Sequence, residues 1–173
     1  MRAGVLCAAA VAGVSGLVPT PIGTGPRYQP PPRGPLKTHY ACRPLPLAQG
    51  PRVHLELFAN RRVVIVPAGI GLERPRPRLG RVVASSCRGP LWSLDPSGVV
   101  RYEPGARLGD FFAVWGEPLG PERLASFRGR VAVYVDGARR FGDPRRLRLR
   151  NRDEIVLEVG GYVPPHPSFR FPP

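Results

Sequence analysis

Apolar and polar residues alternate along residues 53–58, 131–135 and 154–159, and this alternation is typical of strands that bury one face. A turn at 59–62 follows the first of these strands, and the β-branched residues 63–66 return as its partner. The pattern therefore predicts short strands that bury their valines and leucines on one side of a sheet.

A second hairpin is predicted between residues 91–94 and 99–102. The four residues that join them, 95–98, read Asp-Pro-Ser-Gly, and these are residue types of a turn. Asp136-Gly137 is a further signal of a tight turn. Residues 72–81 are rich in arginine and proline, so we expect a loop there.

The period changes to that of a helix after residue 107. Apolar side chains recur at positions i, i+3, i+4 and i+7, which places them on one face of a helix that ends at Gly116 and Pro118. This order of elements predicts an α+β fold, in which one short helix covers a small mixed sheet of hairpins with a β-grasp-like topology. The helical residues are Leu108, Phe111, Phe112 and Trp115.

Composition divides the chain into four segments. Residues 1–18 are an apolar run that is short for a membrane span, and they predict a signal peptide or an N-terminal anchor. Residues 19–38 are a linker rich in proline and glycine, and residues 39–163 carry the patterning of a single α+β domain. Residues 164–173 are a proline-rich tail that cannot pair as an interior strand. We therefore expect an exported, extracytoplasmic protein that is secreted or anchored to the cell membrane.

The formal net charge is +14, from 26 basic and 12 acidic residues, and Lys37 is the only lysine. The arginines are scattered along the chain, and no nucleic-acid-binding motif accompanies them. A genome of high GC content, whose codons favour arginine, explains this composition. Arginine-driven binding to an anionic polymer or a cell-envelope component is the weaker alternative.

Two cysteines, Cys42 and Cys87, remain once residues 1–18 are set aside. In an exported protein an isolated pair most often forms one disulfide. The competing interpretation is a pair of metal-binding thiols, but the spacing lacks a C-x-x-C motif and histidines do not lie nearby. We therefore predict a disulfide between the two.

Candidate chemistry is sparse along the chain. No motif for nucleophilic catalysis, phosphate binding or zinc-dependent hydrolysis is present, so we assign no catalytic residue and no cofactor and favour a protein without enzymatic activity. The histidines are His39, His54 and His166, and only His54 lies within a predicted strand. Its polar neighbours Arg52 and Glu56 indicate a half-exposed position.

The chain from about residue 40 to residue 172 resembles a family of small, functionally uncharacterised exported proteins of bacteria and archaea. That family has a cysteine, a His-x-His strand, a second cysteine and a Leu-His-Thr-His-Asp-x-Ser-Gly motif, followed by a Leu-Gly-x-Phe-Phe-x-x-Trp-Gly helix. The matching residues here are Cys42, the segment 66–71, Cys87, Asp95, Ser97-Gly98, the segment 108–116 and 135–137.

The histidine pairs of the family suggest a metal site built from two neighbouring strands, with positions i and i+2 on one face. In this chain His54 keeps one of these positions, but Arg52 takes the other position of its pair. Trp92 and Leu94 replace the second pair. The resemblance therefore implies a degenerate site, and we expect it to hold no metal. Asp95 remains as a possible oxygen donor.

These observations leave three hypotheses open. The first is an exported, non-enzymatic binding or structural module, in which Trp92 and Leu94 form a partner surface or part of a filled core. The second is an extracytoplasmic protein that binds copper or zinc through His54 and Asp95, with His39 or His166 as further donors. The third is binding to a polyanion or to the cell envelope through arginine.

Overall fold

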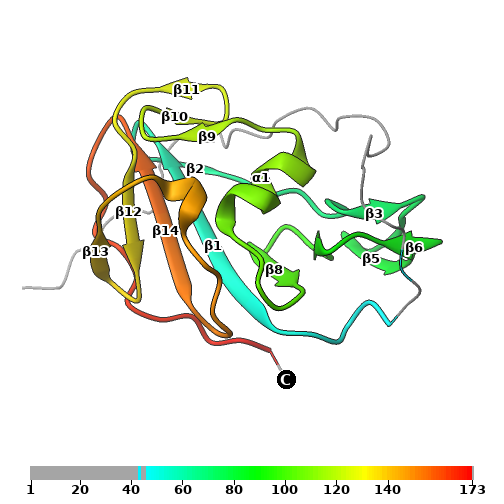
Figure 1. The fold of residues 1–173 in the computed structure, drawn as a ribbon. Coiled ribbons are helices and arrows are strands. Elements are labelled where there is room, and N and C mark those ends of the chain that lie inside the picture. The colour runs from blue at the N-terminus through cyan, green and yellow to red at the C-terminus, as the bar shows by residue number, and fades with distance from the viewer. Residues whose placement is uncertain (1–42, 44–45, 173) are drawn as a thin grey trace, which may run out of the picture.

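The computed structural model describes Arg43 and residues 46–172, and a mixed sheet forms its centre (Figure 1). In this α+β arrangement the strand order is β13-β12-β14-β1-β8-β7, and β2 pairs with β1 beside β8. β1 and β14 are parallel, and the other neighbours in the sheet are antiparallel. The strands are β1 (Arg52–Ala59), β2 (Arg62–Val64), β7 (Leu91–Ser93), β8 (Val99–Tyr102), β12 (Ala132–Val135), β13 (Ala138–Arg140) and β14 (Glu154–Val159).

One face of this sheet is covered by α1 (Leu108–Trp115), as the helical period predicts. The helix begins where the Arg107 N–H donates to the Asp110 carboxylate at 2.8 Å. It ends at Gly116, whose positive φ of 77° lets its N–H donate back to the last turn. The alternating apolar residues of β1, β12 and β14 pack against the apolar residues of α1 in one continuous core.

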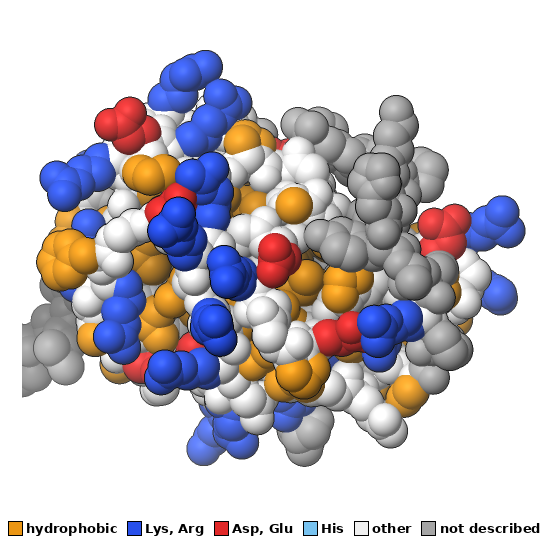
Figure 2. Space-filling view, in the orientation of Figure 1, with side chains coloured by type: hydrophobic (Ala, Val, Ile, Leu, Met, Phe, Trp, Pro, Cys, Tyr) orange, Lys and Arg blue, Asp and Glu red, His pale blue; other side chains and the backbone are white. Residues whose placement is uncertain are grey.

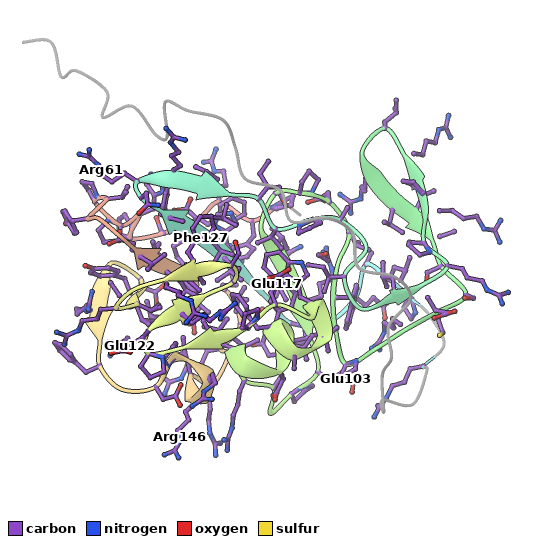
Figure 3. The ribbon with its side chains drawn as sticks, turned by 90° about the horizontal axis from the view of Figure 1, so that it is seen from above. Arg61, Glu103, Glu117, Glu122, Phe127 and Arg146 are labelled. Carbon is purple, nitrogen blue, oxygen red and sulfur yellow. The ribbon has the colours of Figure 1, made fainter. Side chains whose placement is uncertain are left out.

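Short strands outside the central sheet form three further sheets. β9 (Leu119–Gly120), β10 (Arg123–Leu124) and β11 (Phe127–Arg128) follow α1, and the 3-10 helix η1 (Pro144–Arg146) precedes β14. In the view from above, Glu117 and Phe127 lie toward the middle of the molecule, whereas Arg61 and Arg146 lie at its periphery (Figure 3). The other two sheets pair β3 (Leu72–Glu73) with β6 (Cys87–Arg88) and β4 (Arg76–Arg78) with β5 (Arg81–Ala84).

A second, smaller core lies under the β3–β6 region, and it corrects two expectations. Residues 72–81 are not simply a loop, because they contain β3 and β4. Trp92 and Leu94 are 1% and 2% exposed, so they are filled core and form no partner surface. They pack with Leu72 of β3 and Val82 of β5. These strands are too short to show a clear period in the sequence.

The predicted hairpins are present, with small changes of boundary. The return strand expected at 63–66 is β2, which ends at Val64. Asp136 and Gly137 both have positive φ, at 51° and 75°, as the predicted tight turn between β12 and β13 requires. The predicted signal peptide or anchor (1–18), the linker (19–38), His39 and Cys42 lie outside the described residues. No helix in the described part of the chain is long and apolar enough to cross a membrane.

The tail after β14 covers the face of the sheet that α1 leaves open. It turns back at the end of β14 and returns toward the start of β1 (Figure 1). As predicted, it joins no sheet, but its side chains contact β1. Phe171 is buried near Arg52 and Arg152, whose guanidinium carbons each lie 5.6 Å from its ring centroid.

Substituting Phe111→Ala should test the core between α1 and the sheet. Phe111 is fully buried, and removing a buried aromatic ring costs about 3–5 kcal/mol of the free energy of unfolding. Phe141→Ala is the matched control, because this ring is 87% exposed and its loss should change stability by less than about 0.5 kcal/mol. Urea denaturation followed by tryptophan fluorescence measures both, and equal losses would contradict this description of the core.

The Cys42–Cys87 disulfide stays a prediction, since Cys42 is not among the described residues. Backbone geometry next to the pair supports it: Arg43 N–H donates to Arg88 O at 2.9 Å, and Arg88 N–H donates to Arg43 O at 3.0 Å. In exported, denatured protein carrying Cys7→Ser, a thiol reagent should therefore label no cysteine before reduction and two after it. Labelling of both thiols before reduction would refute the disulfide.

Candidate metal centre

The parallel pairing of β1 and β14 places His54 directly opposite Glu154. Both side chains lie on the sheet face opposite α1, because their neighbours in sequence, Leu55 and Ile155, belong to the core under the helix. His54 is 5% exposed and Glu154 is 1% exposed. The Nδ1 atom of His54 lies 2.8 and 3.0 Å from the two carboxylate oxygens of Glu154, so the two form a buried pair.

The second ring nitrogen of His54 contacts the turn between β7 and β8. Its Nε2 atom lies 2.7 Å from the carbonyl oxygen of Ser97. A carbonyl oxygen only accepts hydrogen bonds, so Nε2 carries a hydrogen and donates it. Nδ1 is therefore the ring nitrogen that faces the Glu154 carboxylate.

Two more titratable side chains join this pair. Glu56 follows His54 by two residues on the same strand face, and donor atoms of His54, Glu56 and Glu154 all lie within 4.8 Å of one another. His166, from the tail, places its Nδ1 atom 2.8 and 3.0 Å from the Glu56 oxygens. Two imidazoles and two carboxylates thus alternate along one face of the sheet.

Phe169, also from the tail, lies flat on His54. The ring centroids are 3.6 Å apart and the planes are 8° from parallel. The half-exposed position expected for His54 is therefore wrong, since the tail buries a histidine that its strand neighbours alone would leave open. Local strand patterning contains no information about a segment more than 100 residues later in the chain.

Burial is the main reason that the pKa of Glu154 is raised above its usual value, because desolvation disfavours the charged carboxylate. The hydrogen bond and positive charge of His54 act in the opposite direction, and the negative charge of Glu56 raises the pKa further. Two carboxylates this close need positive charge between them. A cation bound between them would supply that charge.

Asp95, the oxygen donor expected from sequence, lies outside this group. It accepts hydrogen bonds from the N–H and hydroxyl of Ser97, and Arg81 Nη1 donates to it at 3.3 Å. Asp95 therefore shapes the turn whose Ser97 carbonyl contacts His54, as a turn former does. Arg52 lies opposite Arg101, which in turn lies opposite Trp92, so these three residues share one face across three strands.

Glu56 and Glu154 are the functional candidates that sequence reasoning missed. Glu56 was visible only as a polar neighbour of His54, and Glu154 only as an acid at the start of a strand. The available signal was the repeated i, i+2 spacing of His54 with Glu56, which places two donor types on one strand face. The partner strand and its register could not be read from the sequence.

Arginines are spread over the surface. Figure 2 shows basic side chains over the visible face with acidic side chains between them. Several arginines are paired: Arg43 and Arg88 contact Glu103 at 3.2 and 2.9 Å, and Arg145 contacts Asp143 at 2.6 Å. The Arg145 side chain is mostly exposed, and an exposed pair of this kind contributes little to stability, whereas Arg88 and Glu103 are partly buried.

Comparisons with protein-family models, with curated protein sequences and with solved structures found no match to this chain.

Gly98 permits the close contact between the turn and His54, and Gly98→Ala should remove it. Gly98 has a φ of +85°, and a Cβ atom there would lie 2.6 Å from the Leu55 oxygen and 3.0 Å from His54 Nε2. Gly105→Ala is the matched control, because its φ is +92° but a Cβ atom would meet nothing within 4 Å. Strain alone should cost Gly105→Ala about 1 kcal/mol, and Gly98→Ala should cost about 2 kcal/mol or more. Thermal unfolding of both variants measures the difference, and equal costs would contradict the contact.

Proposed function

We propose that this chain is an exported, non-enzymatic α+β module that binds a divalent transition-metal ion, zinc or copper, at His54, Glu56 and Glu154. The observation that carries the proposal is the convergence of one imidazole nitrogen and two carboxylates within 4.8 Å. Nitrogen and carboxylate oxygen are ligand types that zinc and copper accept. This donor set replaces the pairing of His54 with Asp95 that the second hypothesis from the sequence names.

The surroundings of His54 support this assignment. A metal-ligating histidine usually donates its other ring N–H to a carbonyl or carboxylate, which fixes the tautomer and the ring orientation. His54 makes this contact through Nε2 to the Ser97 carbonyl at 2.7 Å. Its Nδ1 atom is then left to face the carboxylate of Glu154, in the position of a ligand.

The charges of the group also favour a divalent cation. Glu154 is almost completely buried, and burial of an ionised carboxylate is costly unless a positive charge compensates it. Zinc lies about 2.0–2.2 Å from nitrogen and oxygen ligands, so donors that already contact at 2.8–3.0 Å need only small shifts to surround it. The ion takes the place of the hydrogen bond between His54 Nδ1 and the Glu154 carboxylate.

Burial supports a binding role over catalysis at this site. The two most buried donors, His54 and Glu154, lie beneath the stacked ring of Phe169. A substrate has to displace that ring before it reaches the metal. The extracytoplasmic location is part of the same proposal, and it rests on the apolar residues 1–18 and on the isolated cysteine pair.

We also propose a β-grasp relationship for the central sheet. The order β2-β1-β14-β12-β13 supports it, because the first and last strands are parallel neighbours, with the β1–β2 hairpin on one side and the β12–β13 hairpin on the other. α1 connects the two hairpins and covers one face. In this interpretation β3 to β8 are an insertion between the first hairpin and the helix.

Equilibrium dialysis of the full chain against zinc alone, with metal analysis, tests the metal proposal. Wild-type protein should bind one equivalent, and Glu56→Gln and Glu154→Gln should each weaken binding at least 10-fold, the order of effect seen for groups supporting a metal site. Binding should also weaken as pH falls, because protons compete for the same donors.

Glu122→Gln is the matched control for these variants. It makes the same change of an acid to an amide, but at an exposed position between β9 and β10 and outside the donor group, so zinc affinity should stay within about 3-fold of wild type. Glu56 is only partly buried, so its variant should fold even if Glu154→Gln does not. Absence of stoichiometric zinc and copper binding by wild-type protein would overturn the proposal and leave a module without metal.

A further inference from the structure

The C-terminal tail, residues 163–172, follows the donor group along its whole length. It runs back along the sheet face in the direction opposite to β1. Its successive residues meet β14 first, through a backbone N–H, then Glu56, then His54, and finally Arg52. The contacts are Val163 N–H to Glu158 at 3.3 Å, His166 to Glu56 at 2.8 Å, Phe169 on His54 at 3.6 Å, and Phe171 beside Arg52 at 5.6 Å.

Side-chain contacts hold this tail in place, without strand pairing. Among the described residues, no backbone–backbone hydrogen bond joins residues 164–172 to the sheet. Prolines at 164, 165, 167 and 172 remove the N–H groups that strand pairing needs. The attachment of the tail therefore depends mainly on His166, Phe169 and Phe171.

We infer that His166 is the fourth ligand of the metal centre and that the bound ion fastens the C-terminal tail to the sheet. This inference rests on the proposed function. His166 Nδ1 lies within 3.0 Å of both oxygens of Glu56, and Glu56 is one of the three donors that converge with His54 and Glu154. His166 is not itself in the group of donors that lie within 4.8 Å of one another, so its ring has to move from Glu56 toward His54 and Glu154 to reach an ion held there.

The fourth ligand determines what kind of metal centre this is. Zinc sites with four protein ligands are structural and closed, whereas catalytic sites have three protein ligands and an open position for water. With His166 in place, the tail closes the site, and the ring of Phe169 lies over His54 beside it. The ion then serves to hold the last residues of the chain against the sheet.

Metal binding and tail docking strengthen each other in this arrangement. A group that binds only the docked form shifts the equilibrium toward docking, and docking raises metal affinity by the same factor. Almost no backbone hydrogen bonds hold the tail against the sheet. The bond between His166 and the metal is therefore the contact that most changes the fraction of molecules with a docked tail. The exchange of the tail amides with solvent should report this coupling directly.

Cobalt(II) and zinc binding to the full chain, compared among wild type, His166→Ala and Arg170→Ala, test the inference. Arg170 is the matched control because it lies in the same tail and its side chain is exposed. Wild-type protein and Arg170→Ala should show the intense visible absorption of tetrahedral cobalt(II). His166→Ala should show the weaker absorption of a site with added water, and its zinc affinity should fall at least about 10-fold.

Amide hydrogen exchange on the same proteins supplies the second readout. Zinc should slow exchange at residues 166–171 in wild type and in Arg170→Ala, but not in His166→Ala. If wild type binds zinc while His166→Ala keeps its affinity and its cobalt spectrum, and zinc leaves tail exchange unchanged, the inference fails and the proposed function stands. If wild type binds no metal, both fail.

Discussion

The parallel pairing of β1 with β14 is the constraint on which the rest of this structure depends. Its register fixes which residues of both strands face α1 and which face the tail. On one side it assembles the core around Phe111, and on the other it places His54 opposite Glu154. A shift of one residue would exchange the two faces, burying the charged groups under α1. The core and the candidate metal centre are therefore products of the same register.

The two faces of the sheet are covered by different means. The α1 face is closed by ordinary apolar packing, which is stable without any partner. The opposite face carries His54, Glu56, Glu154 and Glu158, and an unassisted chain gains little by burying such groups. Paired charges and the ring of Phe169, which stacks on His54, offset the energetic cost of that burial. In our proposal a metal ion completes it.

Much of the fold could be predicted from the sequence, because its local patterns agree with the final structure. The bounds of α1 follow from an unambiguous helical period and a glycine stop, and both tight hairpins follow from their turn residues. Strands of two residues, such as β3, β6 and β9, were beyond prediction because two positions show no period. Their existence depends on tertiary contacts with the sheet.

The candidate site was predicted only in part. His54 stood out as a histidine within a strand, and His166 was considered as a further donor. Glu154 could not be assigned, since its role comes from pairing with a strand 100 residues earlier in the chain. Trp92 and Leu94 could equally have been surface or core, and burial against Leu72 and Val82 decides for core. Local sequence identifies donor types, whereas topology decides which donors meet.

The distance along the chain between β1 and β14 has a consequence for how this protein folds. β1 lies at the centre of the sheet, yet its parallel neighbour follows it by 100 residues. On its other edge β1 pairs with β2 and β8, both of which lie nearer to it in the chain. Native contacts as far apart as those of β1 with β14 slow folding. The two sides of the central sheet can therefore form separately, but only this long-range pairing joins them.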